Sequence, residues 1–297
     1  METLEQTRRQ LESFDELESI VRTMKALAAV SIRQFEAAVR SLHDYYRTVE
    51  LGLRVVLHDL PAPPPRIVRS GRHEVGLVVF GSDHGLCGRF NEDAAAVALE
   101  HWCGSSAAER PRLLVIGARV AALLEGAGVA IEEVMPVPGS AARITATVRQ
   151  ILFKIDEWQA TASFARVDLL HNRPLPVSRY LSAHVKLLPV DLHRFRRAAH
   201  GAWPSRTLPT YTMDRERLLA ALVRQFLFVS IARACAESLA AENASRLAAM
   251  QAAEKSMADR HEELLAEYRR RRQDAITAEL QDVVSGYEAL RSSGARR

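Results

Sequence analysis

The sequence predicts an α/β protein in which two long terminal helices pair antiparallel and enclose one globular domain. Two segments without helix breakers carry this prediction. No proline precedes Pro61 and Gly52 is the only glycine before it, while residues 210–285 contain neither residue type. As helices of about 55 and 75 residues, these segments would reach roughly 80 and 110 Å at about 1.5 Å per residue, too long for a compact domain. The middle of the chain instead alternates short apolar runs with helical stretches. Two long helices flanking one globular domain suggest a mechanical or architectural role.

The composition is that of a folded chain without a strong charge bias. Of 297 residues, 48% are hydrophobic and 26% charged, and the net charge of +4 is too small to indicate a nucleic-acid-binding surface. The three cysteines, Cys87, Cys103 and Cys235, lack the spacing of a zinc site, which predicts a reducing compartment. The start lacks a signal-peptide core, and no uninterrupted apolar run of about 18 residues is present. We therefore expect a cytoplasmic protein that can still be peripheral to a membrane complex.

Residues 1–60 are predicted to form the first coiled-coil helix, because apolar residues recur at every seventh position. The first heptad position holds Phe14, Val21, Ala28, Phe35, Leu42, Val49 and Val56, and the second holds Leu17, Met24, Ser31, Ala38, Tyr45 and Gly52. Such a seam is typical of a left-handed coiled coil. The alternative is an amphipathic helix packed on its own domain, but a domain of this size cannot cover that length. Four prolines in residues 61–65 end the helix, and residues 61–74 read as a stiff, proline-rich linker.

Residues 75–209 are predicted to form the α/β globular domain. The expected strands are residues 75–80, 112–117, 129–134, 167–171 and 180–188, and the expected helices are residues 91–102, 119–126 and 141–159. Strands that alternate with helices indicate a mainly parallel sheet with right-handed crossovers.

The loop after the first strand, GSDHGLCG at residues 81–88, suggests three enzymatic or structural interpretations. It is rich in glycine but lacks both phosphate-binding patterns, GxxxxGK[ST] and GxGxxG. Cys87 near His84 could be a thiol nucleophile with its base, although no third group to orient the base is evident. We favour a turn in which glycines supply positive φ angles and Leu86 and Cys87 pack inside. The other histidines show no metal-ligand spacing and are expected to be surface or structural residues: His171, His193 and His200.

Residues 210–297 are predicted to form the second coiled-coil helix, with Thr212 or Asp214 as its N-cap. Its apolar series is Leu222, Val229, Ala236, Met250, Met257 and Leu264, interrupted by Asn243, which could set the register. If this helix runs back antiparallel to the first, it reaches the level of the first residue near residue 270. Residues 271–290 should then continue as a lone helix of roughly 30 Å, and the arginines at 269–272 lie where the partner ends.

Three blocks of sequence resemble the gamma subunit of F-type ATP synthases, the central rotor shaft. They are IVRTMKALAA at residues 20–29, VVFGSDHGLCGRFN at 78–91, and a C-terminal block from ESLAAENASRLAAM at 237–250 to RRQDAITAEL at 271–280 and Gly286. Arg89, Ser256 and Tyr287 depart from the family pattern. The opening VRTMKALAAVSIRQ is similar to gamma subunits of an alternate, sodium-translocating bacterial type. The resemblance covers almost the whole chain and implies a Rossmann-like α/β globular domain joined to the coiled coil.

The resemblance implies a rotor subunit without catalytic, cofactor-binding or metal-binding residues of its own. Its expected partners are the hexamer of alpha and beta subunits, the epsilon subunit and the membrane c-ring, and no nucleic acid. It would couple ring rotation to the catalytic beta subunits from the cytoplasmic side of the bacterial inner membrane, as a peripheral component. The coupling ion, proton or sodium, would be chosen in the membrane ring.

The same resemblance assigns contacts with the stator to six residues: Met24, Arg246, Arg272, Gln273, Thr277 and Glu279. Met24 could instead serve only coil packing, because it holds a heptad position. The arginines at 269–272 could form a solvated face or contact phosphates. Two rival functions follow, a coiled-coil scaffold that binds nucleic acid and a small α/β enzyme with Cys87 as nucleophile. The spacing of Ile276, Thr277 and Glu279 favours the rotor.

Overall fold

A computed structural model describes residues 4–58, 74–104, 110–161, 164–175, 179–199, 203, 207 and 209–294. The chain divides into two compact units, one formed by Leu27–Ala249 and the other by Met1–Ala26 together with Met250–Arg297. We call them the globular unit and the helical unit. The helices α1 (Leu4–His58) and α6 (Arg215–Gly294) contribute to both. The predicted proline-rich linker lies outside the described residues, except for Glu74.

The globular unit contains one five-stranded sheet in the order β3-β2-β1-β4-β5. Its strands are β1 (Glu74–Phe80), β2 (Arg112–Ile116), β3 (Glu133–Met135), β4 (Phe164–Leu175) and β5 (Arg179–Leu188). Neighbouring strands run parallel, except that β5 runs antiparallel to β4. In the register of the sheet, Gly76 of β1 lies opposite Arg112 of β2 and Val167 of β4. The predicted α/β fold with a mainly parallel sheet is confirmed.

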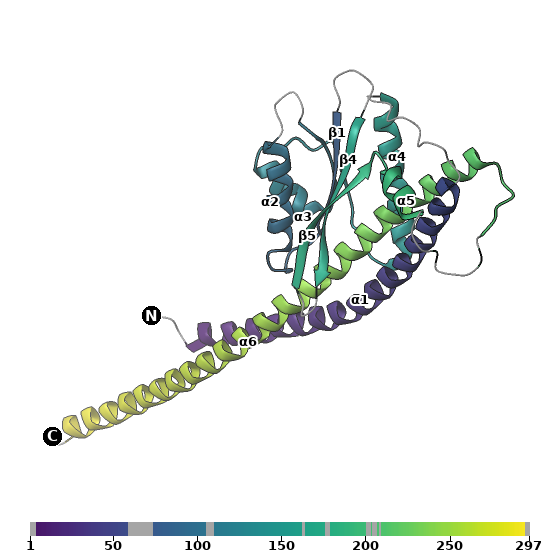
Figure 1. The fold of residues 1–297 in the computed structure, drawn as a ribbon. Helices are drawn as coiled ribbons and strands as arrows, with labels where there is room; N and C mark the ends of the chain where they lie inside the picture. Colours follow the sequence, from purple (N-terminus) through teal and green to yellow (C-terminus); the bar gives the residue numbers. More distant parts are fainter. Residues whose placement is uncertain are drawn as a thin grey trace. The chain divides into compact units, whose positions relative to one another are not determined.

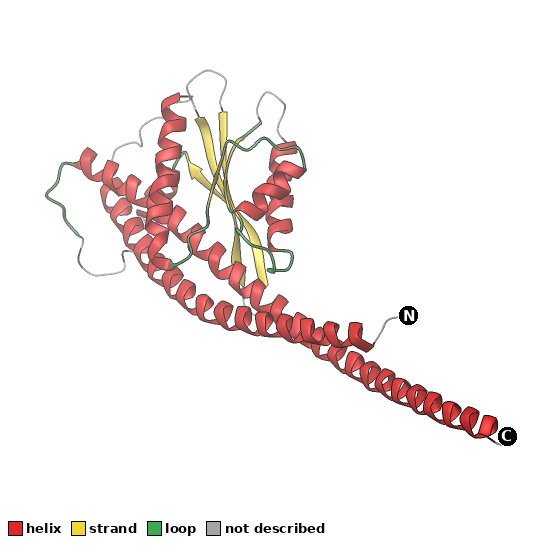
Figure 2. Cartoon of the chain, turned by 180° about the vertical axis from the view of Figure 1, so that it is seen from behind, coloured by secondary structure: helices red, strands yellow, loops and turns green. Residues whose placement is uncertain are grey.

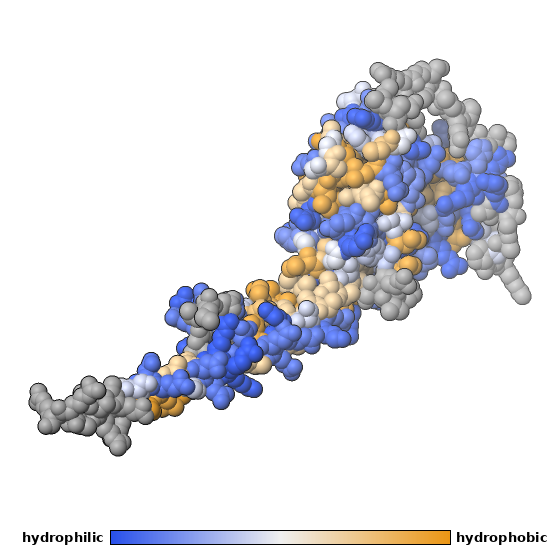
Figure 3. All heavy atoms as spheres, turned by 90° about the vertical axis from the view of Figure 1, so that its left-hand side faces the viewer, coloured by the Kyte–Doolittle hydropathy of each residue, from blue (hydrophilic) through white to orange (hydrophobic). Residues whose placement is uncertain are grey.

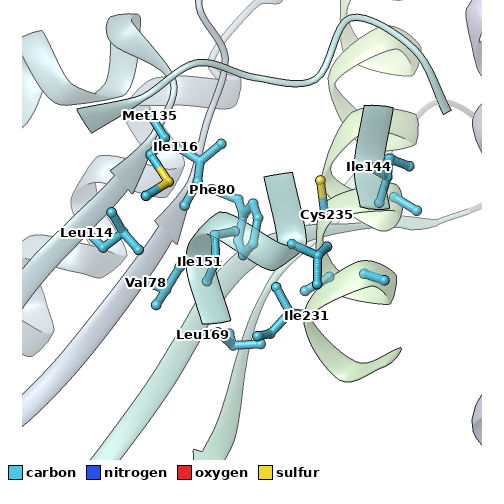
Figure 4. Packing of buried hydrophobic residues seen from close by; sticks show 14 of the residues in the cluster. Val78, Phe80, Leu114, Ile116, Met135, Ile144, Ile151, Leu169, Ile231 and Cys235 are labelled. Carbon is cyan, nitrogen blue, oxygen red and sulfur yellow. The ribbon is translucent and has the colours of Figure 1, made fainter. Parts of the chain in front are cut away.

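The two faces of the sheet bury alternate residues of each strand. Leu77 and Val79 of β1 pack beneath α2 (Phe90–Cys103) and α3 (Ala118–Gly126), whereas Val78 and Phe80 face α4 (Ile144–Thr161) and α6. Figure 1 shows α2 and α3 on one side of the strands and α4 on the other. In Figure 4 the side chains on the second face converge from strands, α4 and α6, with Ile231 and Cys235 supplied by α6. This period of two is what a sheet covered on both faces requires.

Two elements differ from the sequence prediction. The third strand was expected at residues 129–134, but Val129 follows Gly128, whose φ is +79°, and its N–H donates to Leu124 O at the end of α3. Val129 therefore closes a helix, and β3 begins only at Glu133. The short helix α5 (Leu192–Ala199) was not predicted. Its Phe195 is buried with Val49, Leu53 and Leu57 of α1 and Phe226 of α6.

Within the globular unit, α1 and α6 pack antiparallel, as the sequence predicts. Tyr45 Oη donates to Gln225 Oε1 over 2.7 Å, and Gly52 approaches Leu222 so closely that an added Cβ would lie 2.9 Å from its Cδ2. Residue numbers therefore fall along α1 as they rise along α6. Figure 2 shows the two helices side by side along this stretch. Asp214 is the N-cap of α6, since its Oδ1 accepts from the N–H of Arg217 over 3.0 Å.

The helical unit continues the antiparallel pairing with its own contacts. Lys25 Nζ lies 2.6 Å from Glu254 Oε2, and His261 Nε2 lies 3.3 Å from Asp15 Oδ1. From Arg272 to Gly286 every described side chain is exposed, which fits the expected start of a lone helix near residue 271.

The heptad prediction is right for one position and partly wrong for the other. The first position is buried or half-buried throughout, with Ala28, Phe35, Val49 and Val56 in the core. At the second position, however, Leu17 and Tyr45 are exposed. The Asn243 amide donates to Leu239 O of its own helix over 2.8 Å, so it does not set the register through a bond to α1.

The apolar character of α6 reflects its place in the core. Among the described helices, α6 is long and apolar enough to cross a membrane by composition, with an 18-residue window of mean hydropathy 1.7. Yet Ile231, Ala232 and Ala236 are buried against the sheet and α4 in the globular unit.

Candidate functional surface

The loop after β1 is closed by its own hydrogen bonds. The N–H of Gly81 donates to Ile116 O over 2.8 Å, and the N–H of Ser82 donates to Asn91 Oδ1 over 2.9 Å. Asp83 accepts from the N–H groups of Ala118 and Val137 through its two carboxylate oxygens, both over 3.0 Å. Because Gly81 and Ser82 already donate their N–H groups within the protein, this part of the loop cannot cradle a phosphate. The loop instead ties β1 to the start of α3.

Cys87 lies in this loop as a structural residue. Its side chain is buried, and burial raises the pKa of the thiol, while a hydrogen bond with Ser82 acts in the opposite direction. Its Sγ lies 3.3 Å from Asn91 Nδ2 and 3.8 Å from the carbonyl oxygen of His84, whose side chain is exposed. A protonated thiol without an imidazole beside it is a poor nucleophile.

The predicted turn geometry is correct for Gly88 and wrong for Leu86. Gly88 has φ of +59°, but Leu86 also has a positive φ, of +62°, and its side chain is 59% exposed rather than packed inside. The left-handed conformation at Leu86 turns its side chain outward and lets Cys87 point into the core. Cys87 and Phe90 then pack against Ala241 of α6.

A second contact joins this loop to α6. Ser245 Oγ donates to the carbonyl oxygen of Cys87 over 2.6 Å, and both groups are buried. The family-like loop sequence therefore serves the attachment of α6 to the globular unit.

A third contact, centred on Glu237 of α6, was missed by the sequence reasoning. Glu237 Oε2 accepts from His171 Nε2 over 2.8 Å and from Arg173 Nε over 3.0 Å, and Oε1 accepts from Arg233 Nε over 2.7 Å. His171 is buried, as a structural histidine was expected to be, whereas His193 is exposed and His200 lies outside the described residues. The one available signal was a carboxylate within an otherwise small and apolar stretch of α6.

Arg246, one of the predicted stator contacts, lies in the globular unit and is largely enclosed. Its side chain is 12% exposed, and its guanidinium lies 2.6 Å from Glu242 Oε1. Burial raises the pKa of Glu242, and the charge of Arg246 opposes that shift. The guanidinium is therefore already engaged within α6.

The other predicted stator contacts lie in the helical unit. Met24 is half-buried, whereas Arg272, Gln273, Thr277 and Glu279 are all exposed within two turns of α6. Thr277 Oγ1 donates to the carbonyl oxygen of Gln273 over 2.9 Å, so its hydroxyl proton is engaged within its own helix. Nothing else in the described part of the chain touches these four side chains through a hydrogen bond or an ion pair.

The same part of α6 carries an exposed apolar stripe. Ile276, Leu280, Val283 and Val284 are between 49% and 66% exposed and recur at helical spacing. Figure 3 shows apolar side chains on the surface of this part of α6 among polar ones. The side chains of Tyr287 and Leu290 lie outside the described residues. A stripe of this kind on a single helix is typical of a surface that another protein covers.

A metal-binding site was also sought among the residues that the structure describes. No group of three His, Cys, Asp or Glu side chains there has the geometry to hold a metal ion.

A model of the ATP synthase family matches residues 3–290. Curated relatives are gamma chains: the ATP synthase gamma chain of Granulibacter bethesdensis is 28% identical over 98% of this chain and 100% of its own length. The gamma chain of Sorangium cellulosum is 26% identical over the same shares.

Solved structures share the fold. A chain of the Euglena gracilis mitochondrial ATP synthase, in a structure of OSCP, F1 and c-ring, superposes with a TM-score of 0.70 at 15% identity and covers 98% of this chain and 95% of its own. A chain of the rotor of the same synthase gives a TM-score of 0.64 at 14% identity, covering 92% of this chain and 98% of its own.

Proposed function

The chain belongs to the family of ATP synthase gamma subunits, the central-stalk component of the rotor, and we propose that it couples rotation of a membrane c-ring to the catalytic cycle of the beta subunits. Its partners would be the alpha and beta subunits, the epsilon subunit and the c-ring. A single asymmetric shaft gives each of three surrounding beta subunits different contacts. Rotation then moves each subunit through states of different nucleotide affinity, because differential contacts shift conformational populations.

The continuity of α6 is the observation that supports this coupling best. The helix α6 is 80 residues long. In the globular unit it packs against the sheet and α4, and in the helical unit it carries an exposed apolar stripe. A continuous helix can transmit a rotation applied at one part to a surface at another.

We assign the stator contacts to the exposed turns of α6. Arg272 and Gln273 offer hydrogen-bond donors beside the apolar stripe, and Thr277 and Glu279 flank it. The stripe would turn in an apolar bearing, where non-directional contacts oppose rotation little. Met24 would make a separate stator contact from α1, at the level of Glu254 of α6, which pairs with the neighbouring Lys25. Arg246 can contribute only by leaving Glu242, so we expect its contact to be the weakest.

The subunit itself is proposed to be non-catalytic and to lie on the cytoplasmic side of the membrane, peripheral through the complex. The closed hydrogen bonding of the loop after β1 supports the first part. The narrower resemblance to the sodium-translocating type is not supported by the comparisons, and the ion-binding residues of the c subunit would decide it. The alternative of a nucleic-acid-binding scaffold is not favoured.

Reversible cross-linking tests the proposed contact. In a chain whose native cysteines are replaced, Ile276→Cys would be paired with a cysteine in the facing beta loop of the assembled complex. Oxidation should abolish ATP hydrolysis, and reduction should restore it, because a fixed shaft cannot turn. As a control, Ala258→Cys, at another exposed position of α6, should leave activity unchanged in the same oxidant. Full activity with the cross-link formed would contradict the proposal.

A further inference from the structure

Where α6 packs within the globular unit it is buried on nearly all sides, and many of its buried side chains are small and apolar. Ala232, Ala234, Ala236, Ala240 and Ala241 are all buried there. Contacts between such residues are non-directional, and they fix the distance between packed elements better than they fix rotation or sliding. If rotation is to pass between the sheet and α6, contacts with directional geometry must resist slippage.

Glu237 provides the strongest directional contact between the sheet and α6. His171 and Arg173 are two residues apart on β4, so both side chains point to the same face of the strand. Both donate to the same carboxylate oxygen of Glu237, over 2.8 and 3.0 Å. Hydrogen bonds weaken steeply as their angles deviate, so an axial shift or a turn of α6 would break both.

The carboxylate of Glu237 stays charged because of its hydrogen-bond donors, above all His171 and Arg233. Its side chain is only 5% exposed. Burial by itself would raise its pKa, but the hydrogen bonds and charges of His171 and Arg233 lower it to about 2. The group therefore stays ionised at neutral pH, and moving it away from β4 would leave a buried charge with fewer partners. Arg233 cannot replace them in linking the sheet, because it lies on α6 itself.

Ser245 makes a second directional contact further along α6. Its hydroxyl donates to the carbonyl oxygen of Cys87 over 2.6 Å, in the loop that follows β1. Eight residues separate it from Glu237, about 12 Å along a helix axis. Two attachments, one to β4 and one to the loop after β1, hold a rod against rotation better than one.

We propose that Glu237, held by His171 and Arg173 of β4, is the joint through which torque passes between the globular unit and α6, with the Ser245–Cys87 hydrogen bond as a second attachment. These residues would be positioning residues for coupling and would not touch nucleotide. The inference rests on the proposed rotor function.

Two matched pairs of variants test the joint. Arg173→Ala removes a donor from β4 to α6, and Arg166→Ala removes an arginine of similar exposure from the same strand, 44% against 45%, whose partner Asp168 is also on β4. Glu237→Gln removes the charge of the joint. Glu267→Gln removes a charge of α6 whose ion-pair partner, among the residues that the structure describes, is Arg271 on the same helix.

The measurement is the number of ions pumped per ATP hydrolysed by the whole complex in sealed vesicles, with thermal melting and assembly recorded beside it. We expect this ratio to fall about twofold or more in Arg173→Ala and Glu237→Gln, because a loosened contact lets hydrolysis proceed without full rotation of the ring. Arg166→Ala and Glu267→Gln should keep the wild-type ratio, and Arg173→Lys should recover most of it because the charge is retained.

Different outcomes would refute the proposed joint and the proposed rotor function. A wild-type ratio in assembled Arg173→Ala and Glu237→Gln complexes, even with lowered melting temperatures, would show that these residues serve only the fold and would overturn the joint. If Glu237→Gln fails to fold, Arg173→Ala decides, because its side chain is partly exposed. A wild-type complex that hydrolyses ATP without pumping would contradict the proposed function itself.

Discussion

Glu132 offers a test of the energetics of the globular unit. Both oxygens of its carboxylate accept from Arg112, over 2.5 and 2.7 Å, and one also accepts from Trp158 Nε1 over 3.0 Å. Lys154 Nζ lies 3.0 Å away. Burial by itself would raise the pKa of Glu132, but the hydrogen bonds from Arg112, Trp158 and Lys154 lower it to about 2, from an ordinary value of 4.5.

The size of the effect follows from this pKa shift. At about 1.4 kcal/mol per pKa unit, the shift corresponds to roughly 3 kcal/mol. The side chain is 23% exposed, so solvent screening reduces the expected contribution to about 1–2 kcal/mol. Glu132→Gln should therefore lower the free energy of unfolding at pH 7 by about 1–2 kcal/mol.

The stabilisation by Glu132 should depend on pH in a defined direction. A carboxyl group whose pKa is depressed by folding stabilises the fold above its unfolded pKa, and the contribution is lost as the pH falls toward the folded pKa. In urea unfolding of the purified full chain, the difference between wild type and Glu132→Gln should be complete at pH 7 and shrink between pH 5 and pH 3. Glu133→Gln, whose carboxylate contacts only Lys154 at 3.3 Å among the described residues, is the control and should have little effect. A difference independent of pH would refute the electrostatic reasoning.

Three further outcomes are expected. Gly81→Ala should lower the free energy of unfolding by about 1–3 kcal/mol, because its Cβ would lie 2.2 Å from Val120 Cγ1, whereas Gly85→Ala has no atom within 4 Å and should be neutral in the same urea titration. Alkylation at pH 7, followed by mass spectrometry, should modify the exposed Cys103 well before Cys87, whose burial raises its thiol pKa; equal rates would contradict the buried position. The double variant Arg272→Ala, Gln273→Ala should fold and assemble but lower steady-state ATPase turnover by up to about fivefold. The reason is that exposed charged contacts contribute about 1 kcal/mol or less. Unchanged turnover, or a melting temperature lowered by many degrees, would contradict the role assigned to these two residues.

The sequence predicts the fold well where one signal dominates. The absence of Pro and Gly predicts α1 and α6 to within a few residues, and the apolar runs predict β1, β2 and β5. The prediction fails where tertiary contacts decide. Val129 looks like a strand residue but ends α3 through a turn at Gly128, and α5 is an eight-residue helix whose formation depends on burying Phe195 between α1 and α6.

The functional surface is also only partly predictable, because some of its residues are placed by tertiary contacts. Helix length alone places the exposed turns after Arg271, and the structure finds every described side chain there exposed. The contacts of Glu237 with His171 and Arg173 join residues more than 60 positions apart, so no local pattern predicts them. For Arg246 the motif predicts a stator contact, but it does not indicate that the guanidinium already pairs with Glu242.

Observation of single complexes tests the central claim most directly. The alpha and beta subunits would be fixed to a surface with this chain assembled among them, and a bead would be attached to Cys103, which is exposed at the end of α2 in the globular unit. A rotor shaft predicts that ATP drives continuous rotation of the bead in one direction, which stops when ATP is removed. A complex that hydrolyses ATP while the bead shows only undirected fluctuation would contradict the account.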